Sequence, residues 1–284
     1  MTEKIEDAAA AAQEEALAAA YEQALAAEKA GETERAAELY REVLRLDPED
    51  RPGAAIRLAA MGLAPAPETA PPAYVALLFD QTAEVFDNLL VEQLGYDVPM
   101  QLREALIPLG PLGRVLDLGC GTGLLGEALE EQASHLTGLD LSEGMVEIAA
   151  EKEVYDDLYT GDAVAFLTLA EDERWDLIAA TDMAPYLGDL APLLQAAAAG
   201  LTPGGMLAFS TETLPDEILD GRDYMVGPKH RYAHAERYLR AALARAGFAE
   251  PDISGIIVRY DEAQAVPGHL VLARLAGDRS SPQT

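Results

Sequence analysis

The stretch that decides the fold is VLDLGCGTG, residues 115–123, where a short apolar run leads into three glycines at alternate positions. The run predicts a buried strand, and the LLGEALEE that follows predicts a helix over residues 124–131. A tight turn between a strand and a helix places backbone N–H groups and a helix N-terminus beside a ligand. The stretch therefore predicts a cofactor site at the carboxyl end of a strand.

Predicted strands and helices alternate from this point on. Helices are expected at 144–152, 163–169, 190–201 and 235–246, between strands at 115–118, 135–139, 158–160, 177–180 and 206–211. Such alternation predicts a parallel sheet covered by helices on both faces. Strands at 253–260 and 270–275 have no helix between them, which implies an antiparallel hairpin at the end. The α/β region is expected over residues 110–275, followed by a disordered tail at 276–284.

Two classes of cofactor are bound by this geometry. Gly121, Gly123 and Gly126 satisfy G-x-G-x-x-G, the dinucleotide fingerprint, which alone is weak evidence. The overlapping set Gly119, Gly121 and Gly123 follows Asp117 in the sequence and fits a different class of cofactor. Three further stretches separate the two classes.

These stretches follow the second, third and fourth strands. LTGLDLSEGMVEIA places Asp140 at a strand end, where its carboxylate can accept ribose hydroxyls, and continues with Ser142 and Met145. YTGDAVAFL places Asp162 and the N–H of Ala163 beyond the third strand, and LTPGGMLAFSTE carries a Pro-Gly-Gly turn into the fifth.

In this order, the motifs resemble the class I methyltransferases that use S-adenosylmethionine. The resemblance covers residues 110–275 and implies a Rossmann-like sheet of seven strands with the last antiparallel, and S-adenosyl-L-homocysteine as the product. No metal is implied. The cofactor-binding residues that it implies are Asp117, Gly119, Cys120, Gly121, Gly123, Asp140, Leu141, Met145, Gly161, Asp162, Ala163 and Thr181.

Residues 1–62 form a separate helical segment. Helices are expected at 17–30 and 33–46, broken at Gly31, with a third at 52–61. The spacing of Ala24, Gly31, Ala36 and Tyr40 resembles one tetratricopeptide repeat, and a single repeat cannot bury its own face. Either a docking surface, for the rest of the chain or for a second copy, or a groove for a protein partner fits this segment.

The proline-rich stretch at 63–73 is expected to be a semi-rigid linker, and residues 74–109 a helical lid. The repeat-like helices, the lid stretch LFDQTAEVFDNLLVEQLGY and RYAHAERYL, in this order, resemble a bacterial group of predicted methyltransferases with tetratricopeptide repeats. That group implies no acceptor.

Acceptor-side candidates come from three places. The lid offers Tyr74 and Phe79, and the fourth strand ends in Asp182 and Tyr186. Asp182 either orients a cationic or hydroxylated acceptor or caps a turn, and Tyr186 is either a pocket wall or a hydrogen-bond donor.

The third place is a basic cluster comprising Lys229, His230, Arg231, His234 and Arg237, with Tyr232 inside it. The cluster is either a solvated helix start or a site where Arg231 captures a carboxylate or phosphate. If Arg231 and His234 share one helix face, His234 is the candidate general base.

Composition limits the partners. Fifty acidic residues against 20 basic ones give a formal charge of −30, which disfavours nucleic acid. Cys120 is the single cysteine, the start of the chain lacks the pattern of a signal peptide, and no apolar run is long enough for a membrane span. We therefore expect a cytoplasmic protein without membrane partners.

The leading hypothesis is methyl transfer to a small polar or anionic metabolite through oxygen, nitrogen or sulfur. The alternatives are a protein methyltransferase that docks its target on the N-terminal helices, a non-catalytic adaptor that binds the cofactor, and a nicotinamide oxidoreductase.

Overall fold

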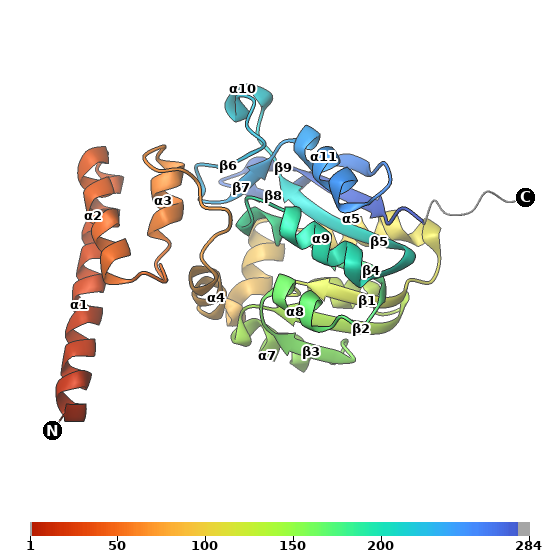
Figure 1. Ribbon diagram of the computed structural model, residues 1–284, viewed down its shortest axis with the longest axis horizontal. Helices are drawn as coiled ribbons and strands as arrows, with labels where there is room; N and C mark the ends of the chain where they lie inside the picture. Colours follow the sequence, from red (N-terminus) through yellow and green to blue (C-terminus); the bar gives the residue numbers. More distant parts are fainter. Residues whose placement is uncertain (1, 278–284) are drawn as a thin grey trace, which may run out of the picture.

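A computed structural model describes the backbone of residues 2–277 and the side chains of residues 11–277. Most of the predicted C-terminal tail, from residue 278 onward, lies outside this range. Figure 1 shows three N-terminal helices at one end of the molecule, the sheet with its covering helices at the other, and α4 between them.

The sheet is the predicted one. Its parallel strands are β1 (Gly113–Leu118), β2 (Ala133–Asp140), β3 (Asp157–Thr160), β4 (Trp175–Ala180) and β5 (Leu201–Glu212), arranged β3-β2-β1-β4-β5. On the far side of β5 lies β9 (Gln264–Arg274), which runs antiparallel to β5 and pairs with β8 (Asp252–Asp261). The predicted antiparallel last strand is therefore confirmed.

Two short strands were not predicted, and they raise the sheet to nine strands within residues 2–277. They are β6 (Tyr224–Val226) and β7 (Tyr232–His234), which form an antiparallel hairpin. The pairing of β4 with β5 reaches Phe209, whereas β7 joins β5 at Glu212. The hairpin thus extends the sheet beyond the end of β4, at the carboxyl end of β5.

Helices cover both faces of the sheet, as the alternation predicts. One apolar cluster joins the sheet to α8 (Ala163–Leu169), α9 (Ala191–Gly200) and α11 (Glu236–Ala246), and another joins it to α5 (Val98–Leu106) and α6 (Leu124–Leu129). Val115 belongs to the second cluster and its neighbour Leu116 to the first, because successive side chains of a strand point to opposite faces. The remaining helices of this region are α7 (Glu143–Glu151) and α10 (Asp216–Leu219).

The N-terminal segment consists of α1 (Thr2–Lys29), α2 (Thr33–Leu46) and α3 (Ala54–Ala60). The predicted break at Gly31 is confirmed, although the first helix begins well before residue 17. Ala24, Ala36 and Tyr40 are fully buried where the first two helices meet. Small residues therefore let the helices approach, while the likeness to a tetratricopeptide repeat stays a prediction.

The N-terminal helices pack on the rest of the chain through α3. Ile56 is buried in an apolar cluster that also contains Val75, Val226 and Tyr232. Nearby, Nε2 of His230 lies 3.7 Å from a carboxylate oxygen of Glu28. The segment is thus joined both to the lid and to the β6–β7 hairpin.

The proline-rich stretch, expected as a semi-rigid linker, is hydrogen-bonded through its backbone to residues between β4 and α9. Ala70 donates to the carbonyl of Tyr186 at 2.8 Å, and the carbonyl of Glu68 accepts from Gly188 at 2.8 Å. The carbonyl of Pro67 accepts from the Tyr232 hydroxyl at 2.6 Å. Prolines lack an N–H, but the residues between them pair as in a sheet edge. The stretch is therefore held against the rest of the chain by its own backbone.

The lid contains α4 (Pro72–Asp80), a 3₁₀ turn at Ala83–Val85 and a π-helical turn at Asn88–Gln93, and ends in α5 and a 3₁₀ turn at Ile107–Leu109. Two aspartates hold it on the sheet's helices. Asp80 accepts from the Ser142 hydroxyl at 2.5 Å and from the Gly144 N–H at 3.2 Å. Asp87 accepts from the Thr122 hydroxyl and from the Lys152 ammonium.

None of the helices within residues 2–277 combines the length and the apolar character that crossing a membrane requires.

The burial of Ile56 predicts that the N-terminal helices stabilise the whole chain. Ile56→Ala should lower the free energy of unfolding by about 2 to 5 kcal/mol, because it leaves a cavity between α3, the lid and the hairpin. Denaturant titration followed by the fluorescence of Trp175, the single tryptophan, measures this change. Leu63→Ala, at a side chain that is 37% exposed, is the control and should change stability by about 0.5 kcal/mol or less. Equal effects of the two substitutions would show that α3 does not stabilise the core.

Candidate active site

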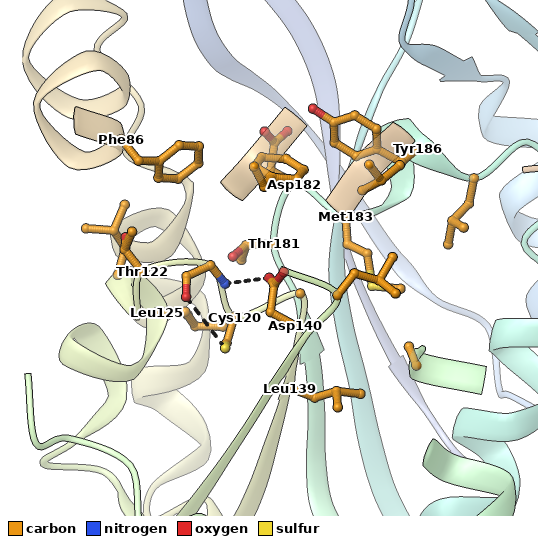
Figure 2. Close-up of a pocket in the computed structure, with 18 of the residues that line it drawn as sticks. Phe86, Cys120, Thr122, Leu125, Leu139, Asp140, Thr181, Asp182, Met183 and Tyr186 are labelled. Atoms are coloured by element: carbon orange, nitrogen blue, oxygen red, sulfur yellow. Dashed lines mark hydrogen bonds between the residues drawn. The ribbon is translucent and has the colours of Figure 1, made fainter. Parts of the chain in front are cut away.

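A pocket lies at the carboxyl ends of the parallel strands, beneath the lid. It is open to solvent on one side, and its lining runs from the glycine turn to the aromatic rings of the lid. Figure 2 shows the glycine turn and Asp140 on one side, and Phe86, Asp182 and Tyr186 on the other. Of the predicted site residues, those that line the pocket are Phe79, Gly119, Cys120, Gly121, Asp140, Leu141, Gly161, Asp162, Ala163, Thr181, Asp182 and Tyr186.

The glycine turn presents its backbone to the pocket. Gly119 and Gly121 have φ angles of +68° and +54°, which side chains rarely adopt. A methyl group added to Gly121 would meet only the ring of Phe86, at 3.8 Å, so this position is open. The N–H groups of Gly119 and Cys120 donate to the carbonyl of Leu139, which anchors the turn on β2.

Asp140 ends β2 with its carboxylate beside this turn. One oxygen accepts from the Gly121 N–H at 2.9 Å and the other from the Ser142 N–H at 2.8 Å. Burial raises the pKa of Asp140, while these hydrogen bonds oppose the increase. Two hydrogen bonds thus fix the carboxylate beside the glycine turn, and its contact with a ribose stays a prediction.

Gly126, the third glycine of the G-x-G-x-x-G pattern, contacts a tyrosine instead of the pocket. A methyl group on Gly126 would lie 2.5 Å from the ring of Tyr155, and one on Gly138 would lie 3.0 Å from it. The Tyr155 hydroxyl accepts from the Gly126 N–H and donates to Asp117 at 2.7 Å. Gly126 therefore makes room for a tyrosine instead of a pyrophosphate. The sequence analysis missed Tyr155, which follows a helix without any motif of its own.

Three predicted cofactor residues, Asp117, Gly123 and Met145, do not line the pocket. Asp117 and Met145 are fully buried, and Gly123 begins α6 with a φ of +91°. Burial raises the pKa of Asp117 to about 7, and its Oδ1 has no hydrogen-bond partner.

Asp162 lines the pocket from the start of α8. One of its oxygens accepts from the Ala165 N–H at 2.8 Å, so the side chain caps this helix. Gly161 and Ala163 also line the pocket, and the role of these three residues at the adenine stays a prediction.

Aromatic rings enclose the opposite end of the pocket. Phe79 makes edge contacts with Phe86 and Tyr186, with ring centroids 5.8 and 5.3 Å apart. Tyr96, which the sequence analysis did not single out, adds a buried ring to the lining. We call this region, with Asp182, the acceptor end.

Asp182 follows β4 in a left-handed conformation, with a φ of +59°. Its N–H donates to the Ser210 hydroxyl at 2.9 Å, and its Oδ1 accepts from Arg231 at 2.6 Å. Burial raises the pKa of Asp182 even though Arg231 and Arg259 oppose the increase.

Arg231 does not line the pocket, so its expected direct contact with a substrate is wrong in this structure. Its guanidinium donates to Glu212 through Nε, to the Tyr186 hydroxyl at 2.6 Å and to Asp182. Arg259 donates to the same oxygen of Glu212 at 2.6 Å. We call Asp182, Glu212, Arg231 and Arg259 the buried quartet. Sequence reasoning missed Glu212 and Arg259, because strand residues far apart in the chain carry no signal of pairing.

The assignment of His234 as a general base is also wrong. Residues 232–234 form a strand instead of a helix start, so Arg231 and His234 do not share a face. His234 is fully buried, its Nε2 lies 3.1 Å from the Gly188 carbonyl, and its ring stacks on Tyr238. Burial lowers its pKa to about 4.

Two further substrate candidates support the pocket wall instead of lining it. Tyr232 is fully buried and bonded to Pro67, and Tyr74 packs on Gly53. The outer members of the basic cluster are matched by acids, as Lys229 lies 3.1 Å from Asp261 and Arg237 pairs with Asp223. The outer basic side chains of this cluster therefore form ion pairs with neighbouring acids.

The role of Gly126 gives a direct prediction. Gly126→Ala should raise the Kd for S-adenosylhomocysteine at least tenfold, about 1.4 kcal/mol, because the new methyl group displaces Tyr155 and with it the turn. Gly144→Ala is the matched control, since a methyl group there meets its neighbours at 3.5 Å. Calorimetric titration of both variants measures the difference. Unchanged affinity in Gly126→Ala would mean that Tyr155 does not position the turn.

The buried His234 predicts a dependence of stability on pH. Its folded pKa, about 4, lies below the unfolded value of ~6.5. Its contribution is therefore complete above pH 6.5 and is lost as the pH falls toward 4. Between pH 7 and pH 5 the wild type should lose about 2 kcal/mol more unfolding free energy than His234→Gln. His135→Gln, at a partly exposed site, should follow the wild type, and a parallel loss in His234→Gln would contradict the assignment.

Comparison with known proteins agrees with this geometry. The family model described as methyltransferase domain matches residues 78–250, more than half of the chain. A ubiquinone biosynthesis O-methyltransferase from Xylella fastidiosa is 37% identical over 162 residues, which cover 52% of this chain and 65% of that protein. One of the same description from Coxiella burnetii is 36% identical over 34% of this chain and 42% of its own length. The chain thus spans less than two thirds of these relatives.

Solved structures share the fold. A methyltransferase from Clostridium acetobutylicum, described as dependent on S-adenosylmethionine, covers 70% of this chain and all of its own with a TM-score of 0.51 and 17% identity. One from Archaeoglobus fulgidus covers 62% of this chain and 92% of its own with a TM-score of 0.50, also at 17% identity. With the open glycine turn and Asp140 in place for its cofactor, S-adenosylmethionine, the chain belongs to the methyltransferase-domain family.

Proposed function

We propose that this chain transfers the methyl group of S-adenosylmethionine to a small molecule bound at the acceptor end. The observation that carries the proposal is one continuous pocket, which runs from the glycine turn, Asp140 and Asp162 to the aromatic rings of the lid. A methyl donor at one end and an acceptor at the other would meet inside it. The names of the relatives support oxygen as the accepting atom.

The residues of the chain would do three things. The turn N–H groups and Asp140 would bind the cofactor, which supplies a methyl group activated by its sulfonium. The lid would exclude water, since Phe79, Phe86 and Tyr96 close the pocket opposite the strands. Asp182 and Tyr186 would orient the acceptor. Alignment of the two reactants is the main requirement of this reaction.

The lining bears on the nature of the acceptor. The charged residues that line the pocket within residues 11–277 are Asp140, Asp162 and Asp182, and all three are acidic. This supports a polar acceptor but not the anionic one expected from the sequence, because Arg231 is engaged by the chain itself.

The test begins with the cofactor. Asp140→Ala should weaken S-adenosylmethionine binding by about 2 to 3 kcal/mol, or roughly 30- to 150-fold in Kd, because a buried carboxylate that accepts two hydroxyls is lost. Calorimetry measures this loss, and Asp172→Ala, at an exposed site, is the control. The wild type should also release S-adenosylhomocysteine when incubated with a metabolite extract, and Asp140→Ala should not. Binding without any release would favour the non-catalytic adaptor instead.

A further inference from the structure

The acceptor end contains a group of charges that sum to zero. Asp182 and Glu212 carry two negative charges, Arg231 and Arg259 two positive ones, and their side chains are 8 to 15% exposed. Arg231 is engaged on all three of its nitrogens, by Glu212, Tyr186 and Asp182. Arg231 therefore has no nitrogen left to pair with a bound anion, and Arg259, which pairs with Glu212, does not line the pocket.

The balance disfavours both kinds of charged acceptor. A carboxylate or phosphate would meet Asp182 at the pocket surface before it met Arg231, which lies behind. An ammonium group would meet an aspartate whose charge is already offset by Arg231 at 2.6 Å and Arg259 at 3.9 Å. Either would leave a charge uncompensated in a buried site, which costs several kcal/mol.

A neutral hydrogen-bond donor suits the same geometry. Asp182 is held by Ser210, by Arg231 and by its own left-handed backbone, so its carboxylate has a fixed direction. Strained residues persist where the surroundings hold them for a task. Beside it, the rings of Phe79, Phe86, Tyr96 and Tyr186 offer apolar surface for the rest of the molecule.

We propose that Asp182 determines the charge of the acceptor. By pairing with Arg231, it restricts the site to neutral molecules that have an apolar body and a hydroxyl group for its carboxylate. The inference rests on the proposed function in that the acceptor is a small molecule. Asp182 is a specificity-determining residue, and Arg231 positions it.

The balance can be shifted by one substitution. Asp182→Asn leaves the quartet with one excess positive charge and loosens the hold on Arg231. Asparagine tolerates the left-handed backbone, so the local structure should persist. The variant should therefore accept an anion that the wild type rejects. Asp189→Asn is the matched control, because Asp189 bonds to Tyr238 and lies outside the quartet.

The experiment uses three probes of one size: benzyl alcohol, benzoate and benzylamine, which is protonated at pH 7. Saturation-transfer NMR measures their binding to protein saturated with S-adenosylhomocysteine, after calorimetry has established that saturation. The wild type should bind benzyl alcohol at least tenfold more tightly than either charged probe. Asp182→Asn should gain at least tenfold in affinity for benzoate, and Asp189→Asn should not.

Several results would overturn the inference. Benzoate or benzylamine binding to the wild type as tightly as the alcohol would do so, as would no binding of any probe. Both of these outcomes are measured on the wild type alone, so they do not depend on whether a variant folds. If Asp182→Asn takes up S-adenosylhomocysteine but gains nothing for benzoate, Asp182 does not set the charge. Failure of the wild type to bind S-adenosylhomocysteine would instead refute the proposed function.

Discussion

The rest of the site depends on how closely the backbone between β1 and α6 can approach a ligand. That approach requires positive φ angles at Gly119 and Gly121, and it requires the turn to be supported from behind. Tyr155 supplies the support, because its ring fills the space that side chains would take at Gly126 and Gly138. The glycines thus fall into two groups. Gly119 and Gly121 leave room for the cofactor on the pocket side, and Gly126 and Gly138 leave room for Tyr155 on the inner side.

Local patterns made the fold and the cofactor end predictable. Strand and helix periods, the glycine turn and the acids after β2 and β3 all lie within short stretches, and their geometry follows from a few neighbouring residues. Asp140 and Asp162 accordingly lie where the motifs predicted them. The acceptor end was less predictable, since its shape depends on β7. Three residues with no strong strand signal were taken for a helix start, and this single error put His234 and Arg231 on one face.

Pairing between distant residues was not predictable at all. Glu212 ends β5 and Arg259 lies in β8, and only the sheet order brings them to Asp182. The contacts of the proline-rich stretch were unpredictable for the same reason, because composition shows that it is no helix but not that its carbonyls and N–H groups have partners. In the structure it ties the N-terminal helices to residues 186–189, next to the acceptor end.

Among the residues whose side chains the structure describes, 11–277, none that lines the pocket belongs to the N-terminal helices, yet these helices contribute to the site through the hairpin. They hold the β6–β7 hairpin through Ile56 and Glu28, and the hairpin carries Arg231 into the buried quartet. The charge of the chain, −30 overall, thus coexists with a neutral cluster beside the expected reaction. A surface of this kind repels anions at long range, and the quartet offers them no partner at short range. The two effects act in the same direction, so selection against anionic acceptors would operate both before and after a molecule enters the pocket.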